Sequence, residues 1–204
     1  MCAAAASAAL SACTGFSSSS AGKEKAESLT GGASRPVYLR AMKTQLSTPR
    51  ADIGTRYVGA HCLPQGKIVW DDALFRELSY RLPKIFRHDA QRAHYRVPPD
   101  AAADLNAPAQ PHYVEIDMQV QHAHADVCMQ EEGSSGRAQL DVLWQVYSAG
   151  TSTPLYETTT QGIYQAPIME RRTTPEFFAN AFSAALNILL TDPGFRAAVK
   201  QAHP

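Results

Sequence analysis

Alternating apolar and polar residues mark the second half of the chain as a sheet. Residues 112–127 carry an apolar side chain at every second position from Val114 to Val120, which is the spacing of one face of a strand. The β-prone residues 137–148 and 155–165 follow, and the Gly- and Ser-containing segments between the three have turn compositions. The pattern predicts a meander of three antiparallel strands.

The first half of the chain predicts two short strands and one helix. Residues 37–42 and 56–61 are rich in residues that favour strands. Apolar residues then recur at helical spacing after Asp71 or Asp72, either of which can cap the N-terminus of a helix. We expect this helix to stop near Pro83, because proline lacks the amide hydrogen that a helix interior needs.

The last segment predicts a second helix. Thr173 is followed three residues later by Glu176, which is the spacing of a capping box. Residues 192–194, Asp-Pro-Gly, end this helix, and residues 194–201 can add a short terminal one. Together the elements predict the α+β class, with a small, mainly antiparallel sheet packed against two amphipathic helices.

Composition and motifs narrow the range of functions. The chain has 19 Lys+Arg and 19 Asp+Glu, so its formal net charge is zero. We therefore expect no nucleic-acid partner, which would need a basic footprint. No apolar run reaches the roughly 18 residues of a membrane-spanning helix. The sequence also lacks a G-x-S-x-G elbow, an H-E-x-x-H helix and a glycine-rich phosphate loop, so we expect neither an enzyme nor a cofactor.

The N-terminus resembles a bacterial lipoprotein signal. Residues 2–12 form an Ala/Ser/Leu segment, and Leu10-Ser11-Ala12-Cys13 looks like a lipobox, whose cysteine receives the lipid. No Lys or Arg precedes Cys13, so either the true start lies upstream or the signal is atypical. The alternative is an Ala-rich tail with an incidental cysteine.

We expect three segments along the chain. Residues 1–12 are an incomplete signal peptide, residues 13–35 hold the lipidated cysteine and a linker, and residues 36–204 form one periplasmic domain. Thr14, rather than an aspartate, follows Cys13, and in this the chain resembles lipoproteins of the outer membrane. The predicted location is the periplasmic face of that membrane.

The cysteines can then be assigned by elimination. Cys2 leaves with the signal and Cys13 carries the lipid, so Cys62 and Cys128 remain in the domain. In an oxidising periplasm we expect a disulfide between them. Two buried free thiols are the alternative.

The segment QHAHADVC places zinc-type ligands at alternate positions, namely His122, His124, Asp126 and Cys128. Neighbouring side chains on one face of a strand lie about 7 Å apart, so all four could share a metal only if the strand bends. The upstream alternation would put them on the core face, so either the strand outruns the core or a bulge near Ala123 changes the register. We expect a solvated strand end with no metal; a metal site at His122, His124 and Asp126 is the alternative.

In its layout the chain resembles small outer-membrane lipoproteins. The lipobox and linker are followed by the extended PVYLR, the helix from Asp72, the strand LDVLWQVYSAG and the C-terminal helix. ABC-transport auxiliary lipoproteins and the assembly lipoprotein of the lipopolysaccharide translocon share a small sheet backed by two helices. The resemblance implies a lipid-anchored, non-catalytic interaction or accessory component of an envelope transport or assembly complex. The alternative is a small periplasmic module that binds a lipid or a metal.

Overall fold

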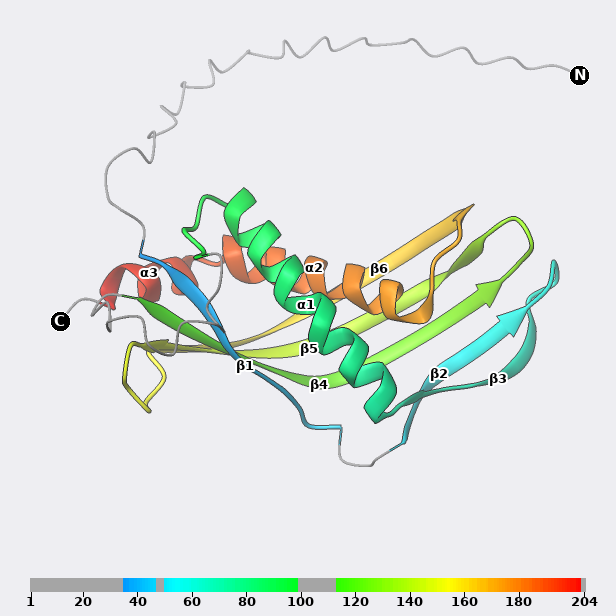
Figure 1. Ribbon diagram of the computed structural model, residues 1–204, viewed down its shortest axis with the longest axis horizontal. Coiled ribbons are helices and arrows are strands. Elements are labelled where there is room, and N and C mark those ends of the chain that lie inside the picture. Colours follow the sequence, from blue (N-terminus) through cyan, green and yellow to red (C-terminus); the bar gives the residue numbers. More distant parts are fainter. Residues whose placement is uncertain (1–34, 47–49, 99–112, 203–204) are drawn as a thin grey trace, which may run out of the picture. The chain divides into compact units, whose positions relative to one another are not determined.

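One six-stranded, mostly antiparallel sheet and three helices make up the described part of the chain (Figure 1). The structure is a computed structural model, and it describes residues 35–46, 50–98 and 113–202, without the side chains of residues 168–170. The predicted α+β class is confirmed. In chain order the elements are β1 (Val37–Thr44), β2 (Ala51–Val58), β3 (Leu63–Trp70), α1 (Asp72–Arg92), β4 (Val114–Met129), β5 (Ser134–Ser148), β6 (Tyr156–Glu170), α2 (Thr174–Thr191) and α3 (Pro193–Gln201).

The predicted meander forms the centre and one edge of the sheet. β4, β5 and β6 pair antiparallel in chain order, and the order across the sheet is β3-β2-β4-β5-β6. β1 and β2 both pair parallel with β4, β1 with residues 114–120 and β2 with residues 125–129. The two short strands therefore lie one after the other along the same edge of β4.

A hairpin that the sequence pattern did not predict precedes α1. β2 ends at Val58 and β3 begins at Leu63, so the predicted strand over residues 56–61 is wrong beyond Val58. The first five residues of β3 are exposed, which leaves no apolar alternation, and Pro64 argues against a strand. β3 lies at the edge of the sheet, where a residue without an amide hydrogen is tolerated.

α1 continues past Pro83 to Arg92, so its predicted end near the proline is wrong. Asp71 caps the helix, because its carboxylate accepts a hydrogen bond from the amide three residues later at 2.8 Å. A proline inside a helix costs about 3 kcal/mol, and burying one phenylalanine side chain contributes about 1.5–3 kcal/mol. Phe86 and Ala90 are buried on the core face beyond the proline. Their packing offsets the lost hydrogen bond.

α2 begins with the predicted capping box. The Glu176 carboxylate accepts hydrogen bonds from the Thr173 amide at 2.6 Å and from the Thr173 hydroxyl at 3.0 Å. After α2 ends, Asp192 caps α3, so the predicted terminal helix is confirmed. The same carboxylate accepts a hydrogen bond from the Tyr156 hydroxyl at 2.6 Å, which ties the junction of the two helices to β6. Among the described helices, none is long and apolar enough to cross a membrane.

The core between the sheet and the helices is rich in aromatic rings. Trp144 of β5 is fully buried, and its ring centroid lies 5.7 Å from that of Phe182 in α2. The indole nitrogen of Trp144 donates a hydrogen bond to the Thr160 hydroxyl at 2.7 Å, and that hydroxyl donates to the carbonyl oxygen of Ala185 at 2.9 Å. These two buried side chains are thus paired in a chain of hydrogen bonds that joins β5, β6 and α2.

β6 approaches the backbone of α2 at Gly162. A Cβ atom on this residue would overlap the carbonyl oxygen of Ala181 and lie 2.5 Å from the amide nitrogen of Ala185. Glycine in the strand and small alanines in the helix together permit this close approach. A larger residue at position 162 would force the two layers apart.

Candidate functional site

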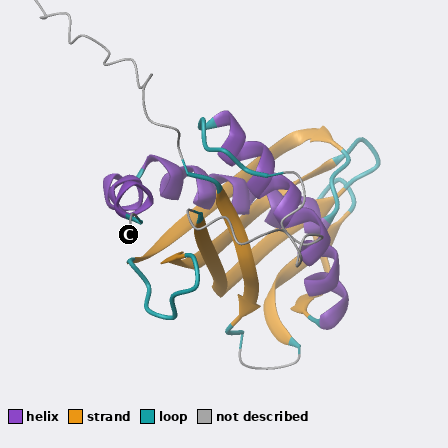
Figure 2. Cartoon of the chain, turned by 60° about the vertical axis from the view of Figure 1, so that its left-hand side comes forward, coloured by secondary structure: helices purple, strands orange, loops and turns teal. Residues whose placement is uncertain are grey.

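The helices leave one face of the sheet open. α1 and α2 lie on one side of the strands (Figures 1 and 2). The candidate residues His122, His124 and Asp126 of β4 alternate with core residues of the same strand and therefore lie on the other side. The predicted lipidation residue Cys13 and residues 1–12 lie outside the described residues.

A bulge in β4 turns the histidine segment toward this open face. The pairing of β4 with β5 shifts between Val120 and His122. Val120 is buried in the core, and after the shift Ala123 and Ala125 are the buried residues. Of the two alternatives, a strand that outruns the core and a bulge near Ala123, the structure shows the bulge. It moves the histidines from the core face to the open face.

The metal-type ligands on the open face form two separate pairs. His124 Nε2 lies 3.1 Å from Asp126 Oδ2, and His122 Nδ1 lies 3.7 Å from Asp141 Oδ2 of β5. Each histidine therefore faces a different carboxylate. Within the residues that the structure describes, no group of three or more His, Cys, Asp or Glu side chains could hold a metal ion. The fold does not bring His122, His124 and Asp126 together around one point.

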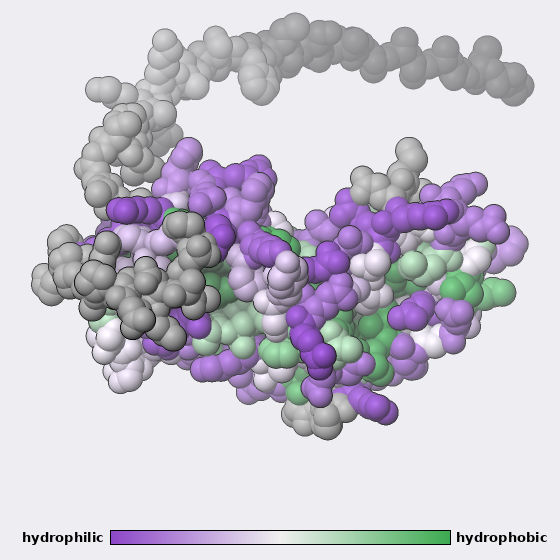
Figure 3. Space-filling model, in the orientation of Figure 1, coloured by the Kyte–Doolittle hydropathy of each residue, from purple (hydrophilic) through white to green (hydrophobic). Residues whose placement is uncertain are grey.

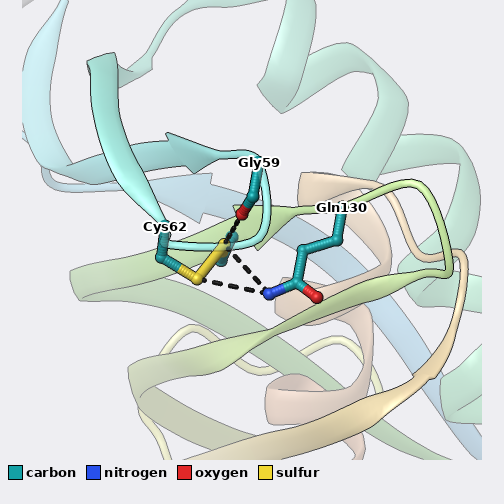
Figure 4. The surroundings of a disulfide bond; sticks show 4 residues. Gly59, Cys62 and Gln130 are labelled. Carbon is teal, nitrogen blue, oxygen red and sulfur yellow. Dashed lines mark hydrogen bonds between the residues drawn. A yellow bond between two sulfur atoms is a disulfide. The ribbon is translucent and has the colours of Figure 1, made fainter.

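A disulfide joins Cys62 and Cys128, as predicted. Cys62 lies in the turn between β2 and β3, Cys128 lies near the end of β4, and their Cα atoms are 5.4 Å apart. Figure 4 shows the side-chain amide of Gln130 beside both sulfur atoms, with Nε2 3.4 Å from Cys62 Sγ and 3.6 Å from Cys128 Sγ. The bond fastens the tip of the hairpin to the neighbouring strand.

An ion pair that the sequence did not reveal lies on the same face. The Asp117 residue is 4% exposed, and Arg40 binds its carboxylate with two hydrogen bonds, from Nε at 2.7 Å and from Nη2 at 2.8 Å. The guanidinium also donates to Glu115 at 2.8 Å and lies 4.1 Å from the centre of the Tyr147 ring. Such a bidentate contact holds the guanidinium of Arg40 in one orientation.

Arg40 lies at a second bulge, in β1. Strand alternation puts Arg40 on the open face with Tyr38, which pairs with Glu115. The pairing of β1 with β4 shifts between Leu39 and Ala41, so Arg40 is the extra residue and its side chain reaches Asp117. Strand alternation puts Glu115 and Asp117 on one polar face, and this is a signal that the sequence does contain. It does not indicate that β1 pairs parallel with β4, which is what brings the arginine to the carboxylates.

Stability should depend on the charge of Asp117 in acid. Burial is the largest single influence and by itself would raise the pKa of this carboxyl, but the hydrogen bonds and positive charges of Arg40 and Lys43 together outweigh it and hold the pKa below the ordinary 3.8. The ionised group therefore stabilises the fold above that pH, and this contribution is lost as the pH falls below it. Between neutral pH and pH about 3, the free energy of unfolding of the wild type should fall by up to about 1.4 kcal/mol per pH unit more than that of Asp117→Asn. Denaturation at a series of pH values measures both slopes. Glu132→Gln, in an exposed turn, should keep the wild-type slope; equal slopes in all three proteins would contradict this prediction.

Comparisons with known proteins do not assign the chain to a family. No family model matches it, and no curated protein matches it. Among solved structures, one that is similar is the crystal structure of a Xanthomonas campestris protein of the family DUF330. The TM-score is 0.37 and the identity 12%, over 81% of this chain and 84% of that chain. A likeness of this size carries no argument about function.

Proposed function

We propose that the chain is a lipid-anchored protein on the periplasmic face of the outer membrane, where its domain acts as a non-catalytic accessory component of an envelope transport or assembly complex. The observation that carries the proposal is the disulfide between Cys62 and Cys128. Disulfides persist in oxidising compartments such as the periplasm. These are the two cysteines that remain once Cys2 is assigned to the signal and Cys13 to the anchor.

The packing between the layers favours a protein partner over an apolar ligand held inside the domain. Trp144, Phe178 and Phe182 are fully buried between the sheet and the helices. The ring of Trp70 lies 6.0 Å from that of Phe178 and extends the same cluster. Protein interiors are packed as densely as organic crystals, so a lipid bound between these layers would have to displace the aromatic rings.

The anchor predicts that Cys13→Ser moves the protein from the membrane fraction to the soluble fraction. Serine has no thiol to accept the lipid, and the acyl chains supply most of the membrane affinity. Fractionation of the protein expressed in its own host, with its native upstream sequence, measures this. Cys2→Ser is the matched control, because Cys2 precedes the predicted mature N-terminus and its loss should change nothing. A Cys13→Ser protein that stays with the membrane, or a wild type that is soluble, would contradict the anchor.

The accessory role has its own test. Wild-type protein extracted in mild detergent after chemical crosslinking should carry at least one other envelope protein. An anchored chain that is recovered alone after crosslinking would support the anchor and rule out the accessory role.

A further inference from the structure

The outward face of α1 is basic over most of its length. Spacings of three and four residues place five exposed residues on one side of the helix, and we call them the α1 face: Arg76, Tyr80, Lys84, Arg87 and Gln91. Figure 3, in the orientation of Figure 1, shows hydrophilic residues over α1. The formal net charge of the chain is zero, but the α1 face carries three positive side chains and no acidic one.

Acidic side chains do not balance this charge along the C-terminal part of the helix. Between residues 78 and 98 the sequence has a single acidic residue, Asp89. It is 6% exposed, and its carboxylate accepts a hydrogen bond from the Ser183 hydroxyl of α2. Its carboxylate is therefore held between the two helices, where it also lies 2.9 Å from His88 Nδ1, and Asp89 is not one of the exposed residues of the α1 face.

The two arginines of the α1 face have no acidic partner within the part of the domain that the structure describes. Across the ranges that the structure describes, Arg76 and Arg87 form no ion pair. Arg81, beside the face, behaves differently, since it lies 2.8 Å from Glu77 and 3.7 Å from Glu176. Both arginines are exposed, so they can meet an anionic surface.

Tyr80 adds an aromatic ring to the α1 face. It is 70% exposed, and Lys84 Nζ lies 3.6 Å from the centre of its ring. Tyrosine combines an apolar body with a polar tip, which suits the boundary between a membrane and water. The Tyr80 side chain is exposed and does not belong to the core.

The chain that leads toward the predicted anchor enters the domain beside the end of α1. Pro36 pairs with Arg96, and the Val37 amide donates to the Arg96 carbonyl oxygen at 2.9 Å. Residues 13–34 can extend over at most roughly 75 Å, and α1 is about 30 Å long. If Cys13 lies in a membrane, the basic helix can reach the surface of that membrane.

We propose that the α1 face docks on the anionic phospholipid surface of the membrane that holds the anchor. This inference rests on the proposed function for the identity of that membrane. A lipid chain combined with a basic patch is a two-signal anchor. Each lysine or arginine near an anionic surface strengthens binding about fivefold, and only within about 10 Å, where salt does not screen the charges. The three cations of the α1 face, Arg76, Lys84 and Arg87, are spread over about three turns of the helix, and this spread fits an extended lipid surface better than an acidic segment of a protein.

Vesicle sedimentation tests the docking without the lipid anchor. The full chain carrying Cys13→Ser should bind vesicles that contain phosphatidylcholine and phosphatidylglycerol, and it should dissociate from them at high salt. It should not bind vesicles of phosphatidylcholine alone. Adding Arg76→Gln, Lys84→Gln and Arg87→Gln should weaken binding roughly a hundredfold. Arg87→Gln alone should weaken it about fivefold, which keeps the test open if the triple variant is unstable.

The matched control removes the same number of charges elsewhere. Arg50, Arg56 and Arg137 are exposed and lie on or beside the sheet, so replacing all three with glutamine should leave vesicle binding within about twofold of the parent chain if the α1 face is the docking surface. Equal losses in the two triple variants, or no preference of the parent for phosphatidylglycerol, would overturn the proposal. The proposal would also be overturned if the parent chain did not bind vesicles and the α1 substitutions abolished crosslinking to another protein. The α1 face would then bind a protein. Because the probe carries no lipid, failure of the anchor at Cys13 leaves this result unchanged.

Discussion

Replacing Gly162 with valine should lower the free energy of unfolding by about 3 kcal/mol or more. The new Cβ would overlap the Ala181 carbonyl oxygen and lie 2.5 Å from the Ala185 amide nitrogen. These are backbone atoms of a helix, so no change of side-chain rotamer relieves the overlap. α2 would have to move away from β6, which breaks the hydrogen bond from Thr160 to Ala185 and loosens the packing of Phe182. Urea denaturation followed by circular dichroism measures the loss.

Gly66→Val is the matched control for this substitution. Gly66 lies in β3, and a Cβ atom added there meets nothing within 4 Å. Valine favours strands, so the free energy of unfolding should change by less than about 0.5 kcal/mol. If Gly162→Val and Gly66→Val unfold at the same urea concentration, β6 and α2 are not packed as described.

Removing the disulfide should lower the free energy of unfolding by about 4 kcal/mol. The bond closes a loop between residues 66 apart in sequence, and the chain-entropy relation gives this value for a loop of that length. We expect it for Cys62→Ala combined with Cys128→Ala, measured by urea denaturation. The tip of the β2–β3 hairpin should also lose protection against amide hydrogen exchange, since the bond holds it to β4.

Reduction provides the control for the disulfide prediction. Wild-type protein treated with dithiothreitol should lose as much stability as the double alanine variant, and the variant should not respond to the reductant. A wild type whose unfolding midpoint is the same with and without reductant would show that the bond does not stabilise the domain.

The local pattern of the sequence was sufficient for the elements whose signals lie within a few residues. The meander follows from alternation, and the start of α2 follows from the three-residue spacing of Thr173 and Glu176. The change of phase in the apolar alternation near Ala123 left two explanations, a bulge and a strand that outruns the core, and the structure shows the bulge. Each of these features depends on the residue types of one segment.

The features that the sequence did not predict depend on contacts between distant segments. α1 continues beyond Pro83 because the helix face on both sides of it is buried in the core, and a local rule sees only the proline. The pair of Arg40 with Asp117 joins residues 77 positions apart through two parallel strands and a bulge. The α1 face becomes visible only when the exposed residues of the helix are known, since the total charge is zero.

The intact mass of the protein extracted from its own host's envelope tests the central claim most directly. Measured under denaturing conditions, the mass should correspond to a chain that begins at Cys13, carries a diacyl or triacyl addition and is two hydrogens short because of the Cys62–Cys128 bond. An unmodified chain that still begins at Met1 would contradict the lipoprotein assignment, and with it the outer-membrane location and the role in an envelope complex.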